Sequence, residues 1–329
     1  MFVEAIEDIL QETCTPAVVR AIEAGQSPAP LWSAVAEGGF LELLTPEADG
    51  GAGLALAELF PVLVTLGRYA MPLPLAQSML ARALLGGKLE RPHAMLSFAP
   101  ALRRLDDGAI VCPLVPFGML AEAVLAEDGH SLLLLSCEDA RREATGIPGS
   151  LVATLAWPDA TSGVRVAQPP GTLAACGAAL PAALLAGAMG RVFDMTLQYA
   201  NDRAQFGKSI GKFQAIQHQV SVMAEQVAAA SIAAEMAFQG RAAVPAMLPS
   251  AIAKARTGEA AVLVAATAHA VHGAIGITEE YDLQLHTRRL HEWRMHHGSE
   301  ACWQVLVGRA VLASDAPTLL DFVRAAAPA

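Results

Sequence analysis

A segment rich in hydrogen-bonding side chains, R-A-Q-F-G-K-S-I-G-K-F-Q, stands out in the C-terminal half of the chain. Arg203 carries a fixed positive fork that matches phosphate oxygens, and Gln205 and Gln214 add amide donors. Gly207 and Gly211 let a ligand approach the backbone closely. These residue types suit an anionic ligand that also exchanges hydrogen bonds, such as a pyrophosphate joined to a nucleoside.

A long helix is expected to position this segment. Apolar residues recur at every third or fourth position, which is the spacing of the buried stripe of a helix. The stripe consists of Phe206, Ile210, Phe213, Ile216, Val220, Met223 and Val227. An ordinary amphipathic helix would account for the stripe but not for the arginine and the glutamines between its members. The sequence therefore predicts a turn followed by a helix that begins at a ligand site.

The predicted elements come in the order helices, strands, helices. Residues 1–91 show helical spacing, and residues 92–168 contain short apolar runs separated by turn formers such as E-D-G-H, a pattern typical of strands. Residues 169–329 are helical again, in four or five long segments. We predict a mainly α fold with a small β insert, divided into three domains at these boundaries.

Composition excludes several classes of function. Hydrophobic residues make up 54% of the chain and charged residues 16%, which predicts additional burial at subunit interfaces. Every apolar run of about 18 or more residues is interrupted by a charge or a turn former, so no membrane-spanning helix is predicted. Residues 176–190 come closest and are predicted to form a buried core helix. The net charge of −10 argues against a nucleic-acid partner.

The five cysteines are scattered, with neither a C-x-x-C motif nor zinc spacing, so no metal site is predicted. Reduced core thiols in a cytoplasmic protein are the expectation. The first ten residues, M-F-V-E-A-I-E-D-I-L, carry early acids and no basic region, so no signal peptide is expected.

Several motifs, in order along the chain, resemble the acyl-CoA dehydrogenase family. They are P-E-A-D-G-G-A-G at 46–53, G-R-Y-A-M-P-L-P at 67–74, R-A-Q-F-G-K-S-I-G-K-F-Q-A-I-Q-H at 203–218 and H-G-A-I-G-I-T-E-E-Y at 272–281. The resemblance extends over nearly the whole chain. It implies an N-terminal α domain, a middle β domain and a C-terminal four-helix bundle.

The resemblance also implies that the chain binds FAD at a subunit interface. In the family, the R-x-Q-F-G segment holds the adenine and pyrophosphate of the flavin in the neighbouring subunit. The residues implied to contact FAD are Arg203, Gln205, Phe206, Ile210, Phe213, Gln214, Gly273 and Gly276. The two glycines would let backbone N–H groups approach that same cofactor.

The positions of the family's catalytic base hold no carboxylate. The family's reaction removes the α-proton of an acyl thioester with a carboxylate, while the β-hydrogen leaves as hydride to the flavin. The stretch M-H-H-G-S-E places His297 at one family position, and alignment on A-G-A-M-G places Leu180 at the other. His297 is the candidate base that remains, although a histidine at a helix turn is more often structural. Glu300 lies nearby but is typical of a carboxylate at a helix N-terminus.

Two further departures affect the expected flavin-ring pocket. The family's T-E-P-x-x-G-S-D-like segment is absent, and M-L-S-F-A-P-A-L-R-R-L-D-D-G stands at that place. Ala270 and Ala274 replace a glutamine and a glycine of the family's Q-x-x-G-G-x-G motif. The ring pocket within this chain is therefore expected to be incomplete.

Two functions are compatible with these features. The first is an FAD-dependent acyl-CoA dehydrogenase subunit that oxidises an acyl-CoA to the 2,3-enoyl-CoA with an unrecognised base, within a fatty acid or steroid side-chain degradation route. The alternative is a non-catalytic partner that completes the FAD site of a heteromeric enzyme, as in the α2β2 family members that act on steroid side chains. Acyl-CoA is the expected substrate and a homo- or hetero-oligomer the expected assembly, with an electron-transfer flavoprotein as one candidate acceptor. An unrelated helical scaffold without cofactor is disfavoured by the ordered motifs.

Overall fold

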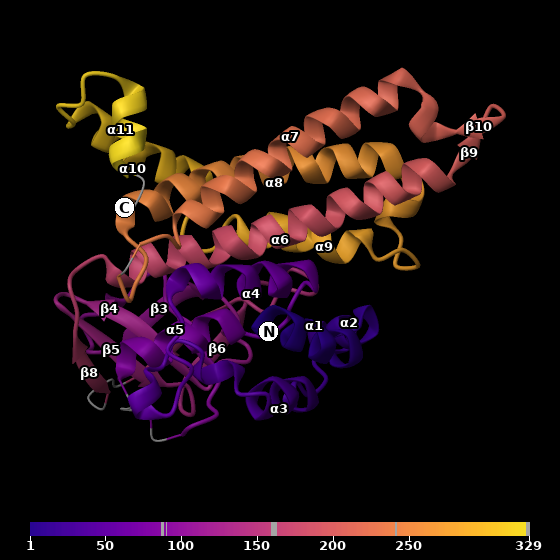
Figure 1. The fold of residues 1–329 in the computed structure, drawn as a ribbon. Coiled ribbons are helices and arrows are strands. Elements are labelled where there is room, and N and C mark those ends of the chain that lie inside the picture. Colours follow the sequence, from indigo (N-terminus) through magenta and orange to yellow (C-terminus); the bar gives the residue numbers. More distant parts are fainter. Residues whose placement is uncertain (87–88, 90, 159–162, 241, 327–329) are drawn as a thin grey trace.

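The computed structural model describes residues 1–329 except 87–88, 90, 159–162, 241 and 327–329. In chain order, a smaller region of β-sheet lies between two helical parts, and the two helical parts pack against each other (Figure 1). This arrangement confirms the predicted mainly α fold with a small β insert.

The N-terminal part consists of five helices and two short 3-10 turns. They are α1 (Phe2–Thr13), α2 (Pro16–Glu23), α3 (Ala29–Glu37), η1 (Phe40–Glu42), η2 (Glu47–Asp49), α4 (Leu56–Arg68) and α5 (Leu75–Leu85). Local sequence fixes several ends. The Thr15 side chain accepts a hydrogen bond from the Val18 amide, directly before the proline that begins α2. Gly39, with φ of 76°, turns the chain out of the α3 region in the left-handed conformation.

The described residues of the β region form two four-stranded sheets. The first has the order β1-β4-β5-β8 and consists of Leu96–Phe98, Ala123–Asp128, Ser131–Ser136 and Val164–Ala167. The second has the order β2-β3-β7-β6 and consists of Arg103–Arg104, Ile110–Val115, Ala153–Trp157 and Arg141–Ala144. The β1–β4 pair is parallel, and the other neighbours are antiparallel. A shared apolar cluster, including Val124 and Leu133 from one sheet and Ile110 and Leu155 from the other, joins them.

The C-terminal part is a bundle of long helices with a small hairpin at one end (Figure 1). Its elements are α6 (Thr172–Asp202), β9 (Ala204–Gln205), β10 (Lys208–Ser209), η3 (Ile210–Lys212), α7 (Gln214–Met236), α8 (Met247–His272), η4 (Gly273–Ile277), α9 (Leu283–Trp293), α10 (Glu300–Leu312) and α11 (Leu319–Ala326). The central rod is α6, which contacts α4, α7, α8 and α9.

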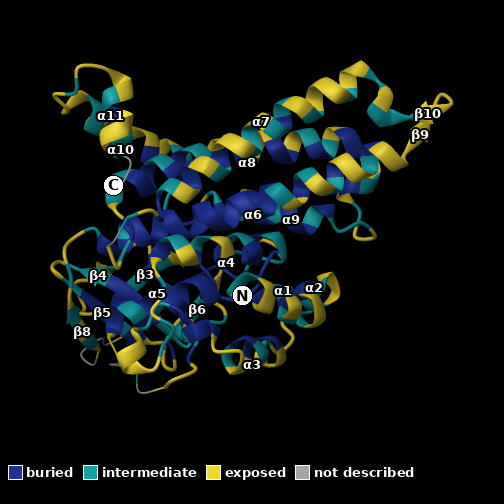
Figure 2. Ribbon diagram, in the orientation of Figure 1, coloured by how far each residue is buried: buried dark blue, intermediate teal, exposed yellow. Residues whose placement is uncertain are grey.

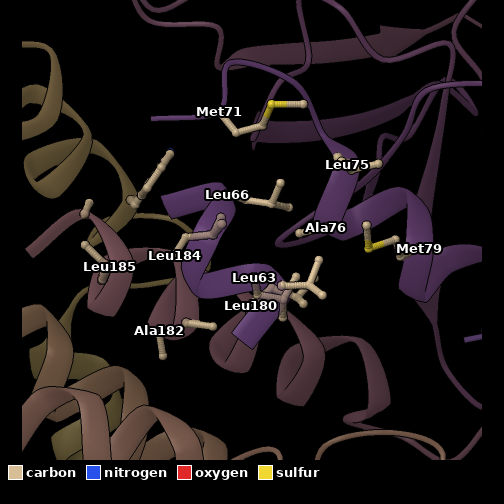
Figure 3. Packing of buried hydrophobic residues seen from close by; sticks show 14 of the residues in the cluster. Leu63, Leu66, Met71, Leu75, Ala76, Met79, Leu180, Ala182, Leu184 and Leu185 are labelled. Carbon is tan, nitrogen blue, oxygen red and sulfur yellow. The ribbon is translucent and has the colours of Figure 1, made fainter. Parts of the chain in front are cut away.

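Apolar side chains of α4, α5 and α6 join the N-terminal part to the bundle. Figure 3 shows Leu63 and Leu66 of α4 beside Leu180 and Leu184 of α6. The two helices approach so closely that a Cβ on Gly187 of α6 would overlap the carbonyl oxygen of Val64. Glycine is therefore a packing requirement at this crossing.

Two helical stretches are long and apolar enough to cross a membrane by length and composition, Thr172–Asp202 and Met247–Ile277. This finding concerns length and composition among the described residues alone, and a buried core helix meets the same criteria. Helix α6 meets them because it continues through Pro181 and its glycines. Within the fold, 89% of the apolar window of α6 is buried, compared with 44% for the second stretch. Every residue from Cys176 to Met189 is buried, which confirms the predicted core helix (Figure 2).

Candidate functional site

The segment around Arg203 and Gln205 forms a hairpin at the end of the bundle where α6 ends. Strands β9 and β10 pair in antiparallel fashion, with Gln205 opposite Lys208. The turn residues Phe206 and Gly207 both have positive φ, 51° and 79°, as a tight two-residue hairpin turn requires. Figure 1 shows the hairpin projecting beyond the ends of α6 and α7. The backbone thus presents this segment outward.

The polar side chains of the hairpin are available to an external ligand. Arg203 and Gln205 are exposed, and neither side chain makes a hydrogen bond or ion pair with any residue that the structure describes. Gln214 is also exposed, in the first turn of α7. Arg203 directly follows α6, and Gln205 lies in strand β9. Because α7 begins at Gln214, the hairpin and not α7 positions these two residues.

The predicted helical stripe was wrong over its first three members. Phe206 lies in the hairpin turn and is 92% exposed, and Ile210 and Phe213 precede α7 in a 3-10 turn and at the helix cap. Phe206 packs edge-on against Phe213, with ring centroids 6.2 Å apart, and Lys208 Nζ lies 4.3 Å from the Phe213 centroid. These aromatic residues therefore form an exposed cluster at the hairpin and not part of a buried core.

The glycines of the second predicted segment lie at the same end of the bundle. Tyr199, in the last turn of α6, stacks on His272 at 4.4 Å, and its hydroxyl donates to the His272 carbonyl oxygen at 3.3 Å. Gly273 is the residue after His272, and it is exposed. Its φ is 64°, and no atom lies within 4 Å of the place where a Cβ would stand. Gly276 differs, because it is buried and a Cβ there would lie 3.0 Å from the Cβ of His272. The structure thus gives Gly276 a packing role and leaves only Gly273 open to a ligand.

His297 lies at the opposite end of α6, in the turn between α9 and α10. Its backbone is left-handed, with φ of 55°. A Cβ on Gly177 would overlap its imidazole, and the Phe98 ring of β1 stands edge-on with centroids 6.5 Å apart. The His297 ring therefore occupies the junction between the bundle and the β region.

The surroundings of His297 make it a weak base. Burial, reinforced by His296 and Lys254, lowers the pKa of His297 to about 3. Efficient general bases have a pKa close to the working pH, since a group with a much lower pKa has little affinity for a proton. The imidazole is neutral at pH 7 but poorly suited to removing a carbon-bound proton.

A buried lysine holds the turn that carries His297. Nζ of Lys254, on α8, donates to the carbonyl oxygen of Trp293 at 3.0 Å and to that of Arg294 at 2.6 Å. These carbonyls end α9, where the helix leaves them without a partner. Burial lowers the pKa of Lys254 to about 7. Lys254 is not among the residues predicted from the sequence, because a lysine in an alanine-rich helix carries no signal of burial.

The remaining positions examined for a base hold no free carboxylate. Glu300, at the start of α10, pairs with Arg294 through two hydrogen bonds. Burial raises the pKa of Glu300, but the bonds from Arg294 outweigh this effect and the net direction is downward. Leu180 is fully buried in the core on α6. A search of the described residues finds no group of three His, Cys, Asp or Glu side chains that could hold a metal ion.

The matches to known families agree with this architecture. Residues 1–87 match the family model for the acyl-CoA dehydrogenase N-terminal domain, and residues 172–312 match the model for the acyl-CoA dehydrogenase C-terminal domain. The acyl-CoA dehydrogenase IpdE2 of Mycolicibacterium smegmatis is 33% identical over 299 residues, which cover 88% of this chain and 90% of that protein. The chain belongs to the acyl-CoA dehydrogenase family. The predicted resemblance is thereby confirmed.

Solved structures share the fold of this acyl-CoA dehydrogenase family member over almost its whole length. The ChsE4-ChsE5 complex from Mycobacterium tuberculosis contains a chain that superposes with a TM-score of 0.82 at 23% identity, covering 96% of this chain and 97% of that one. Butyryl-CoA dehydrogenase from Megasphaera elsdenii superposes with a TM-score of 0.76 at 19% identity, covering 94% and 97%. The fold of the family is thus retained over almost the whole chain.

Proposed function

We propose that this chain is the non-catalytic subunit of a heteromeric acyl-CoA dehydrogenase, in which it completes the binding site of FAD held mainly by a second subunit. The assembly would oxidise an acyl-CoA thioester to the 2,3-enoyl-CoA, with FAD accepting the hydride when it is bound. The observation that carries the proposal is the contrast between the two ends of α6. At one end the exposed side chains of Arg203 and Gln205 have no polar partner among the described residues, and at the other the positions proposed for the base hold no suitable group.

At the hairpin end, the residues fit an anionic dinucleotide. The guanidinium of Arg203 can donate two parallel hydrogen bonds to pyrophosphate oxygens, and Gln205 and Gln214 add neutral donors. The exposed ring of Phe206 offers an apolar face for an adenine. Because these side chains point away from their own subunit, their ligand is held by a neighbouring one.

At the junction end, the three described residues proposed for the base are poorly suited to the chemistry. Leu180 cannot take a proton, His297 has too low a pKa, and Glu300 is engaged by Arg294. About 25 residues of helix separate Gly177 from the end of α6, or roughly 38 Å at 1.5 Å per residue. The hairpin and the junction therefore serve different ligand sites.

Exposed apolar side chains on the outer bundle support a heteromeric assembly. They include Leu197 of α6, Ile232 of α7, Leu263 of α8 and Val305 and Leu312 of α10. Figure 2 shows the exposed faces of α7 and α10 on the side away from the N-terminal part. Surfaces of this kind are usually covered in an assembly. The solved ChsE4-ChsE5 complex is itself an assembly of two different chains.

The test is flavin content with and without a second subunit. The chain purified alone should lack the flavin absorption near ~450 nm, and coexpression with a catalytic acyl-CoA dehydrogenase subunit should yield a yellow complex. Arg203→Ala should lower the flavin content of that complex, whereas Lys212→Ala, which removes an exposed cation from the neighbouring 3-10 turn, should leave it unchanged.

Two outcomes would contradict the proposal. A chain that copurifies with stoichiometric FAD and turns over acyl-CoA alone is a self-sufficient dehydrogenase. Flavin content that is equal in wild type and in Arg203→Ala would remove the role assigned to the hairpin.

A further inference from the structure

A separate cavity of ≈ 260 Å³ lies between the N-terminal helices and the bundle, away from both ends of α6. Its lining residues come from α1, the start of α2, the end of α4, α6 and α9. Arg191, the residue that α6 contributes, is 14 residues from Gly177 and 12 from Arg203, or roughly 21 Å and 18 Å along the helix axis. The cavity is therefore distinct from the hairpin and from the His297 junction.

The walls of the cavity change from polar at the mouth to apolar at the floor. Gln11 and Arg191 are exposed, and Arg68 is half-buried. The floor is made of buried side chains that include Leu10, Val19 and Leu285. With a volume below the ~300–1,000 Å³ of pockets for drug-sized ligands, the cavity suits a compact molecule with a polar end.

A buried histidine with an unused nitrogen lines the floor. His286 of α9 is 6% exposed, and its Nδ1 is buried with no hydrogen-bond partner among the described residues. Buried polar atoms nearly always have a partner, and this nitrogen has none among the described residues, while the imidazole as a whole lines the cavity. Burial, followed by Arg191, Arg289 and Arg68, lowers the pKa of His286 to about 3. The ring is therefore neutral and able to donate one N–H to an oxygen of a ligand.

The charged groups at the cavity are unevenly paired. Arg68 NH2 lies 2.7 Å from Asp194 Oδ2, so part of its charge is already matched. Arg191 forms no ion pair with any residue that the structure describes. Glu7 is the one carboxylate among the lining residues, against two arginines and a neutral imidazole. With Asp194 pairing Arg68, the charges around the cavity balance, and Arg191 is the cation at its mouth that has no ion-pair partner among the described residues.

We propose that this cavity binds a compact oxyanion, a carboxylate or a phosphate, held by Arg191 and Arg68 at the mouth and reaching His286 at the floor. Guanidinium groups form paired, charge-assisted hydrogen bonds with either kind of oxyanion. The apolar floor accommodates the few carbon atoms of a short acid. This inference does not depend on the flavin proposal, because it uses none of the same residues.

The probes are inorganic phosphate and butyrate, each titrated by calorimetry into the full chain in its assembled form. We expect saturable binding of at least one of them, and the stronger binder identifies whether the site takes a phosphate or a carboxylate. Arg191→Gln should weaken that binding by about tenfold or more, since it removes a charge-assisted pair. The matched control is Arg103→Gln, which removes an exposed arginine of β2 that forms no ion pair with the described residues.

A second readout reports directly on the floor. In a ¹H–¹⁵N spectrum of the imidazoles, the His286 signal should shift during the titration in wild type, and in Arg191→Gln the same shift should need about tenfold or more anion. If neither anion binds saturably, or if Arg191→Gln binds as tightly as wild type, the proposal is wrong.

Discussion

Nζ of Lys254 donates a hydrogen bond to the carbonyl oxygen of Arg294 at 2.6 Å, deep inside the bundle. Because the same amine also caps Trp293, its removal leaves two terminal carbonyls of α9 without their donor. Lys254→Met should therefore lower the free energy of unfolding by about 1–3 kcal/mol, as expected for unsatisfied buried groups. Urea unfolding followed by circular dichroism measures this loss.

The pH dependence of that loss has a defined sign. Burial lowers the pKa of Lys254 from 10.5 to about 7 in the folded chain. Between these values the unfolded chain binds the proton and the folded chain does not, so this residue makes stability rise with pH. The difference between wild type and Lys254→Met should widen from about pH 7 to about pH 9, by up to about 1.4 kcal/mol per pH unit. A difference that is constant or shrinks over this range would show that the amine stays charged.

Replacing two glycines of α6, Gly187 and Gly190, with alanine should have different effects on stability. A Cβ on Gly187 would overlap the backbone of Val64, whereas a Cβ on Gly190 would lie 3.2 Å from the mobile end of Arg68. Gly187→Ala should destabilise the chain by about 1–3 kcal/mol through overpacking. Gly190→Ala should be neutral or stabilise by up to about 1 kcal/mol, because alanine favours the helix. Equal effects in thermal or urea unfolding would contradict the close helix crossing.

Replacing His297 should leave the chemistry of the assembled enzyme intact. Asparagine tolerates the left-handed backbone of this position, so His297→Asn removes the imidazole without adding backbone strain. We expect turnover within about twofold of wild type and an unchanged pH profile, since a group with a pKa of about 3 is a poor base. A loss of about 100-fold or more with flavin retained would instead identify His297 as the base.

Removing the exposed phenylalanine of the hairpin should lower flavin retention in the complex but leave the stability of the isolated chain nearly unchanged. Phe206→Gly removes a side chain that is 92% exposed and places glycine at a positive φ. The free energy of unfolding of the isolated chain should change by no more than about 0.5 kcal/mol, while flavin retention in the complex falls. Phe98→Ala, at a fully buried phenylalanine, serves as the contrast and should cost about 3–5 kcal/mol. Unaltered flavin retention in Phe206→Gly would mean that the ring contacts no ligand.

The fold was predictable from the sequence wherever a buried element coincides with a local run of apolar residues. The cores of β3, β5 and β7 coincide with apolar runs, and Cys176–Met189 is as buried as its composition predicts. Strand β2, Arg103–Arg104, is exposed and contains only charged residues, so no hydrophobic pattern predicts it. Edge strands of this kind are defined by their pairing with β3, which is a non-local property.

The candidate site was predictable only in part, for the same physical reason. Arg203 and Gln205 are predictable as ligand-binding residues because their hydrogen-bonding chemistry does not depend on the fold. Phe206 was assigned to a helix because three- and four-residue spacing cannot distinguish a core stripe from an exposed aromatic cluster at a hairpin. Lys254 and His286 are not predictable as buried residues, because their burial results from contacts between helices that are distant in sequence.

Helix α6 runs without interruption from the His297 junction, past the wall of the anion cavity, to the hairpin. Each residue of an α-helix turns its successor by about 100° around the axis. Deleting one residue between Gly177 and Arg203 would therefore swing the hairpin a quarter-turn or more away from a docked neighbour. Helix α6 thus sets both the distance and the rotation between its two ends, so a deletion within it should displace the hairpin where a substitution at an exposed position would not.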